Sequence, residues 1–178
     1  MSTAQIYQFK INLARFKPPI WRRVQVPDHF TFYELHLVIQ DVFEWSGTHL
    51  HQFVKGERRG RYTSEPVYIG KPRKNPEPWE TTLHEKVEQV CDHFSADHPK
   101  MVYEYDLGST WYHDVILEKV LASDGGEYPR CVGGKRGTPV EDPGPDEEPD
   151  DENTGSFDKD QVDFKRYNEY HASENTFD

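Results

Sequence analysis

The chain has 178 residues, which is long enough to bury an ordinary hydrophobic core. Hydrophobic residues make up 34% of it, and its 10 Phe, 10 Tyr and 4 Trp predict a core rich in aromatic side chains. It contains no run of about 18 apolar residues, which argues against a membrane-spanning helix and a membrane partner. Two cysteines and the lack of a secretion signal lead us to expect a cytoplasmic protein with reduced thiols.

The net charge of −11 belongs to the C-terminal part of the chain. Residues 141–178 contain 14 acidic and 3 basic residues, whereas residues 1–140 contain 18 of each sign. The Pro- and Gly-rich acidic segment 141–156 is typical of a loop or linker. We therefore predict one domain over residues 1–140, then this linker, and then a helix over residues 157–171 that docks on the domain through its aromatic side chains.

Two strands are predicted at the N-terminus. Residues 6–13 alternate, with Tyr7, Phe9 and Ile11 on one side and polar residues on the other, which is typical of a half-buried strand. Residues 20–26 have the same alternation. The short Pro-containing loop between them predicts an antiparallel pair.

The next residues predict a helix with well-defined ends. Thr31 and Glu34 have the spacing of a capping box, and apolar residues follow at helical spacing as far as Trp45. Gly47 fits the left-handed position just after a helix. The same Thr–Glu spacing at Thr82 and Glu85 predicts a second, shorter helix.

Between and after these helices, residues 49–56 predict a strand, and residues 103–113 predict a hairpin. We expect Gly108 and Ser109 to form its two-residue turn, of type II′. Paired strands with helices between them indicate an α+β fold, with a mainly antiparallel sheet of about five or six strands and two or three helices packed against it.

The expected hairpin places chemical groups on one face. With the turn at Gly108 and Ser109, Asp106 lies opposite Trp111, and Glu104 lies opposite His113. A carboxylate in that position could orient the imidazole or raise its pKa.

Two arginines of the second strand provide a structural alternative. Arg22 and Arg23 project to opposite sides, so one of them shares the apolar side and needs a partner there. Pairing of Arg22 with Asp106 would make this acid part of the scaffold.

A metal site is a further hypothesis. His49 and His51 are two residues apart on an expected strand and would point the same way, as metal-binding histidines do. His113 and Cys131 could complete a site for zinc or another divalent metal, with Asp106 supporting it and Glu141 or Asp142 adding oxygens. The alternative is that these groups are only hydrogen-bonded within the fold.

A basic segment suggests nucleic-acid contact. Its cations are interleaved with tyrosines, as on surfaces that bind a phosphate backbone, and they include Arg58, Arg59, Arg61, Arg73 and Lys74. An ordinary solvated loop explains the same residues.

Several blocks of the sequence resemble the plasmid pRiA4b Orf-three-like family. They are PPIWRRVQVP (18–27), IQDVFEW (39–45), THLHQFV (48–54), YEYDLGSTWYHDVILE (103–118) and YPRCVGGKRGTPVED (128–142). Ser109 departs from the family pattern, which has Asp after the hairpin Gly, and the residues after Gly137 also differ. The resemblance implies an α+β fold, an association with plasmids or mobile elements in bacteria and archaea, and no established activity.

Three functions from different classes are consistent with these patterns. The favoured one is a non-enzymatic binding or interaction module associated with mobile elements, whose partner is another protein or nucleic acid. The second is a metal-dependent hydrolase that uses the His, Asp and Cys cluster. The third is a nucleic-acid-binding accessory protein that uses the basic segment.

Overall fold

The computed structural model describes residues 4–58, 61–76, 82–141 and 154–174. It forms an α+β fold with one eight-stranded sheet in the order β5-β4-β3-β6-β7-β1-β2-β8. All neighbouring strands are antiparallel except β4 and β5. The strands are β1 (Gln5–Leu13), β2 (Ile20–Pro27), β3 (His51–Arg58), β4 (Arg61–Gly70), β5 (Thr82–His84), β6 (Lys100–Tyr105), β7 (Trp111–Ala122) and β8 (Arg130–Lys135).

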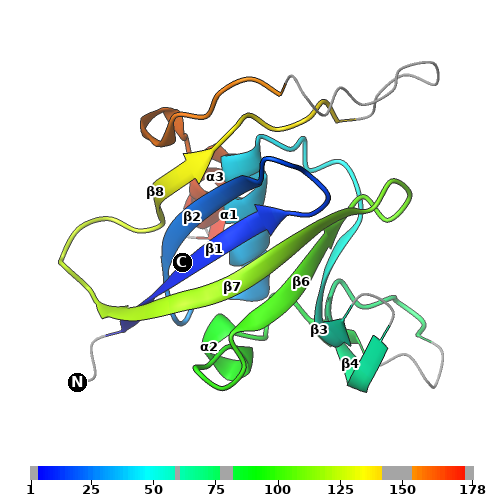
Figure 1. The fold of residues 1–178 in the computed structure, drawn as a ribbon. Helices are drawn as coiled ribbons and strands as arrows, with labels where there is room; N and C mark the ends of the chain where they lie inside the picture. The colour runs from blue at the N-terminus through cyan, green and yellow to red at the C-terminus, as the bar shows by residue number, and fades with distance from the viewer. Residues whose placement is uncertain (1–3, 59–60, 77–81, 142–153, 175–178) are drawn as a thin grey trace.

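Helix α1 (Phe32–Phe43) covers one face of the sheet, and α3 (Lys165–Glu174) packs against α1 (Figure 1). Two shorter helices complete the described elements, namely α2 (Val90–His93) and the 3-10 helix η1 (Lys159–Gln161). The core between α1 and the sheet is rich in aromatic side chains, as the composition predicts, and includes Phe9, Phe32, Phe43, Trp45, Phe53, Tyr103 and Tyr105.

The N-terminal predictions are confirmed. β1 and β2 form an antiparallel pair. Thr31 accepts a hydrogen bond from the backbone N–H of Glu34, and the Glu34 carboxylate accepts one from the N–H of Thr31, so the capping box is present. The end of the helix differs slightly, because Glu44 takes the left-handed conformation directly after α1, ahead of Gly47.

The predicted helix beginning near Thr82 is wrong. Thr82–His84 form β5, which pairs in parallel with β4, and α2 is limited to Val90–His93. The sheet has eight strands instead of the predicted five or six, because β5 forms where a helix was predicted and β8 forms where the sequence shows no periodicity. In the basic segment, which was expected as a loop, Arg58 and Arg61 belong to the ends of β3 and β4.

The predicted hairpin register is wrong by one residue. Tyr105 lies opposite Trp111, and Tyr103 lies opposite His113. Residues 106–110 form a five-residue connection in which Asp106 and Thr110 have positive φ. The Asp106 carboxylate accepts hydrogen bonds from the backbone N–H groups of Gly108 and Ser109, at 3.2 and 3.3 Å, so it shapes the turn.

Candidate functional site

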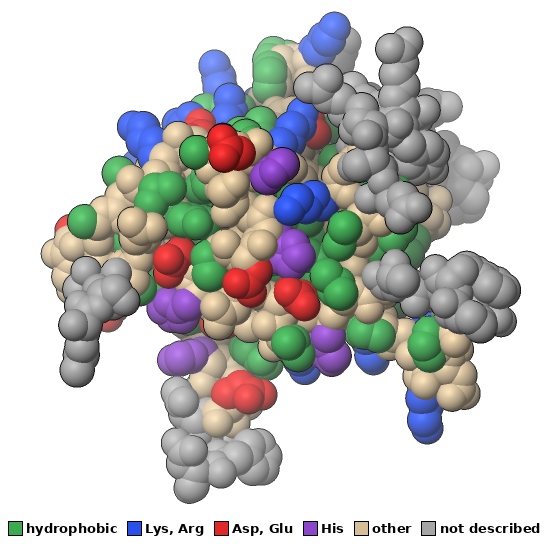
Figure 2. All heavy atoms as spheres, turned by 90° about the horizontal axis from the view of Figure 1, so that it is seen from below, with side chains coloured by type: hydrophobic (Ala, Val, Ile, Leu, Met, Phe, Trp, Pro, Cys, Tyr) green, Lys and Arg blue, Asp and Glu red, His purple; other side chains and the backbone are tan. Residues whose placement is uncertain are grey.

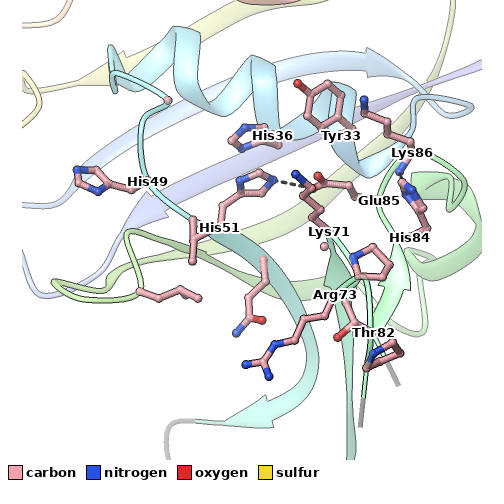
Figure 3. Close-up of a pocket in the computed structure, with 17 residues that line it drawn as sticks. Tyr33, His36, His49, His51, Lys71, Arg73, Thr82, His84, Glu85 and Lys86 are labelled. Atoms are coloured by element: carbon pink, nitrogen blue, oxygen red, sulfur yellow. Dashed lines mark hydrogen bonds and ion pairs between the residues drawn. The ribbon is translucent and has the colours of Figure 1, made fainter. Parts of the chain in front are cut away.

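A pocket of about 700 Å³ lies beside the first turns of α1, where β3, β4 and β5 end or begin (Figure 3). We call it the histidine pocket, because four of its lining residues are His36, His49, His51 and His84. The other described residues that line it are Tyr33, Gly47, Leu50, Gln52, Gly70, Lys71, Pro72, Arg73, Pro76, Thr82, Glu85, Lys86 and Leu107.

At the centre of the histidine pocket, His51 is paired with Glu85. The His51 Nε2 atom lies 2.6 Å from the Glu85 Oε2 atom, and the Glu85 side chain is only 4% exposed. The backbone fixes this acid, because Glu85 donates its N–H to Gly70 and accepts the N–H of Tyr33 at its carbonyl. A carboxylate held in this way orients the imidazole and leaves Nδ1 as the second ring nitrogen.

A second imidazole stacks on this pair. The His36 and His51 rings are parallel within 7°, and their centroids are 3.4 Å apart. His36 Nδ1 lies 2.7 Å from the Tyr103 hydroxyl, which also receives a hydrogen bond from Gln40 Nε2 at 2.9 Å. Burial, with a smaller effect of His51, lowers the pKa of His36 well below its usual value. His36 is therefore neutral at neutral pH.

The rim of the histidine pocket carries cationic side chains. Lys71, Arg73 and Lys86 line it, and Lys86 Nζ lies 4.7 Å from the centre of the Tyr33 ring. Among the described residues that line the pocket, Glu85 is the one acidic side chain, and its carboxylate is bonded to His51. The arrangement is suited to an anion, although the chain as a whole carries a charge of −11.

His49 lies at the edge of the histidine pocket, outside β3, and has different neighbours from His51. Its Nε2 atom is 3.7 Å from carboxylate oxygens of both Asp106 and Glu141. Glu141 also accepts hydrogen bonds from the Tyr105 hydroxyl and from the backbone N–H of Ser46. Asp142, the other predicted acid, lies outside the described residues.

The other two predicted metal ligands, His113 and Cys131, do not line the histidine pocket. His113 is buried in the core, where its Nε2 accepts a hydrogen bond from Trp45 Nε1 at 3.2 Å and its Nδ1 lies 3.1 Å from the Tyr103 carbonyl oxygen. Cys131 is on β8, with its sulfur 3.3 Å from the Gly133 carbonyl oxygen. Across the described part of the chain, no three His, Cys, Asp or Glu side chains are arranged to hold a metal ion.

The predicted pairing of Arg22 with Asp106 is wrong, because the Arg22 side chain has other hydrogen-bond partners within the fold. This side chain is 1% exposed and donates hydrogen bonds to three backbone carbonyls and the Thr138 hydroxyl. The Val42 carbonyl at the end of α1 is one of these acceptors, so the cation also meets the negative end of the helix dipole. Burial lowers the pKa of Arg22 to about 10.

The other strand residues singled out from the sequence are also accounted for. Arg23 forms an ion pair with Glu118 at 2.7 Å. Trp111 packs against Trp45, with ring centroids 5.2 Å apart. Both arginines thus support the sheet and its helix, and neither lines the histidine pocket.

The residues predicted to contact nucleic acid do not form one group in the structure. Arg58 and Arg61 are opposite each other at the end of the β3–β4 hairpin, and Arg59 lies outside the described residues. Arg73 lines the histidine pocket, and Lys74 next to it is exposed. On the face seen in Figure 2, histidine and acidic side chains are interspersed, and Lys and Arg lie mainly toward the upper edge.

The sequence analysis did not single out His36 or Tyr103 as residues of the site. It interpreted Glu85 as part of a helix cap and not as a residue of the pocket. A signal for His36 was present, because His36 and Gln40 are four residues apart among the apolar positions of α1. Two polar residues on the buried side of a helix require polar partners inside the protein. The positions of Tyr103 and Glu85 depend on pairings between distant strands.

The chain is similar to known proteins in sequence and, for one crystal structure, also in fold. The family described as plasmid pRiA4b ORF-3-like protein matches residues 5–170. The uncharacterized protein y4hQ of Sinorhizobium fredii (strain NBRC 101917 / NGR234) is 26% identical over 143 residues, which is 79% of this chain and 68% of that protein. The crystal structure of the protein of unknown function MM3350 from Methanosarcina mazei Go1 is similar with a TM-score of 0.67 and 34% identity, and covers 77% of this chain and 73% of that one.

In the described part of the chain, no helix is long and apolar enough to cross a membrane. Neither relative's name states an activity.

Proposed function

The chain belongs to the plasmid pRiA4b ORF-3-like family, and we propose that it is a non-enzymatic binding module that takes a small anion in the histidine pocket. The observation that carries the proposal is the set of cations in the pocket lining. Lys71, Arg73 and Lys86 line it, and the one acidic side chain among its described lining residues, Glu85, is bonded to His51. The Asp106 and Glu141 carboxylates lie next to His49 at the edge of the pocket.

The local structure supports binding of an anion despite the acidity of the chain. Opposite charges attract most strongly where water is partly excluded, so cations and N–H donors inside a concave site act more strongly than the same groups on an open surface. A pocket of about 700 Å³ is also within the range of small-molecule sites.

The residues predicted to form the centre of a metal-dependent hydrolase lie apart from one another and have other partners. His51 is bonded to Glu85, His113 is bonded to Trp45, and Cys131 lies on β8 at the other edge of the sheet. Zinc sites need three or four ligands that converge on one point. The association with plasmids or mobile elements remains part of the proposal, and its support is the name of the family.

Isothermal titration calorimetry with phosphate, sulfate and acetate at low ionic strength tests the proposal. We expect binding that weakens with salt and falls about tenfold in Lys71→Ala/Lys86→Ala, because two cations near the ligand are removed. Lys119→Ala is the matched control, since Lys119 is an exposed lysine of β7 that does not line the pocket. Absence of binding by all three anions, or equal losses in both variants, would contradict the proposal.

A further inference from the structure

The Tyr103 hydroxyl determines which nitrogen of His36 carries the proton. Burial raises the pKa of Tyr103 well above its usual value, so the hydroxyl retains its hydrogen. The hydroxyl has two hydrogen-bond partners among the described residues, Gln40 Nε2, which donates to its oxygen, and His36 Nδ1 at 2.7 Å. His36 Nδ1 is therefore the one acceptor there for the hydroxyl hydrogen. A neutral imidazole with Nδ1 as acceptor carries its own hydrogen on Nε2.

His36 is therefore a fixed N–H donor at the histidine pocket. Tyr103 is its one hydrogen-bond partner within the described residues, and His36 lines the pocket. The ring cannot easily rotate, because it is stacked on His51, whose own position is fixed by Glu85. A fixed donor requires an acceptor atom, and an anionic oxygen fulfils this requirement best.

The same pocket has an apolar side. Leu50 is 70% exposed and Leu107 is 43% exposed, and both line the pocket. The backbone N–H of Asp106 donates to the Leu50 carbonyl at 2.8 Å, which connects the segment before β3 to the β6–β7 turn. Two exposed leucines beside cations and N–H donors form a surface that is apolar on one side and basic on the other.

We propose that the ligand of the histidine pocket is a small amphipathic anion, with a carboxylate or phosphate head and a short apolar chain. The head accepts a hydrogen bond from His36 and lies among Lys71 and Lys86. The chain covers Leu50 and Leu107. This inference rests on the proposed function and adds the chemical class of the ligand to it.

Calorimetric titration with acetate, butanoate, hexanoate and hexyl phosphate tests the inference, with hexanol as the uncharged control. Affinity should rise by about fourfold for each methylene that becomes buried. The hexanoate and hexyl phosphate titrations distinguish the two head groups. Hexanol should bind at least tenfold more weakly than hexanoate, because it lacks the charge that the cations recognise.

The variant Leu50→Ser/Leu107→Ser isolates the apolar side. It should lose most of the gain in affinity from acetate to hexanoate that the natural chain shows. Equal affinity for acetate and hexanoate in the natural chain would overturn the inference while leaving anion binding intact. Absence of binding by every anion, inorganic phosphate included, would instead contradict the proposed function itself.

The donor role of His36 has its own test. A long-range proton–nitrogen correlation spectrum of the natural protein should show His36 as the Nε2–H tautomer, and hexanoate should shift this resonance. Tyr103→Phe removes the hydroxyl that holds the tautomer and should weaken hexanoate binding several-fold without changing the gain per methylene. A His36 ring that carries its hydrogen on Nδ1 would refute the donor role even where the variant fails to fold.

Discussion

His113 should make the stability of this protein strongly dependent on pH in the acidic range. Its imidazole is fully buried and neutral, and it is held by Trp45 and the Tyr103 carbonyl. Burial lowers the pKa of His113 from 6.5 to about 4. Below pH 6.5 the unfolded chain therefore binds a proton that the folded chain does not, and the folded state loses stability as the pH falls toward 4.

The size of the effect follows from the two pKa values. A difference of about 2.5 between them corresponds to a loss of about 2.5 kcal/mol in the free energy of unfolding between about pH 7.5 and pH 4.5. Urea unfolding followed by tryptophan fluorescence at both pH values measures this loss. His113→Gln keeps a donor and an acceptor but has no titrating group, so its loss should be smaller by that amount.

The comparison of variants separates His113 from the other titrating groups. His36 has a lowered pKa too, and burial raises the pKa of Asp41 to about 6. The change in the free energy of unfolding of the natural protein therefore combines the effects of all three groups. His29→Gln is the matched control, because the His29 side chain is 60% exposed. If the natural protein and His113→Gln lost the same stability on acidification, the argument from burial would be refuted.

Three further variants test the scaffold by urea unfolding. Arg22→Met should lower the free energy of unfolding by about 3 kcal/mol, because it removes the donor of the buried Val42 carbonyl and of two partly buried carbonyls; a loss below about 1 kcal/mol would contradict this role. Asp41→Ala removes the acceptor of the first N–H groups of α3 and should cost about 1 kcal/mol, with faster proteolysis in α3 as the second readout. Glu118→Gln breaks a partly exposed ion pair and should cost less than about 1 kcal/mol.

The elements predicted correctly are those whose signals are local. The capping box of Thr31 and Glu34 and the apolar spacing that follows lie within one helix, and α1 begins where they indicate. The alternation in β1 and β2 is equally local, and a short loop joins the two strands. Such patterns determine structure when no distant residue competes for the same groups.

The prediction at Thr82 and Glu85 failed because distant residues did compete. The spacing is the same as at α1, but the Glu85 carboxylate is bonded to His51, and the backbone of Thr82–His84 pairs with β4. Tertiary contacts therefore override a local helix signal here. Glu85, which was predicted as part of a helix cap, is therefore the acid at the centre of the pocket.

The register between β6 and β7 differs by one residue from the predicted one, and this difference changes the interpretation of the site. A shift of one position in register moves a strand's side chains to the opposite face. Five residues connect β6 and β7, and the actual register pairs the buried Tyr103 with His113 and the buried Tyr105 with Trp111. Asp106 becomes a turn residue, and the acid and imidazole expected to act together are separated.

The pocket itself required contacts that no spacing in the chain reveals. His51 and Glu85 are 34 residues apart, and His36 and Tyr103 are 67 residues apart. The sequence contained the residues and one usable signal, the polar pair of His36 and Gln40 on the buried side of α1. A buried histidine indicates binding more strongly than a pair of histidines on one strand when a partner fixes its tautomer and its other nitrogen is left for a ligand. The reason is that the fold has then determined which group the histidine can recognise.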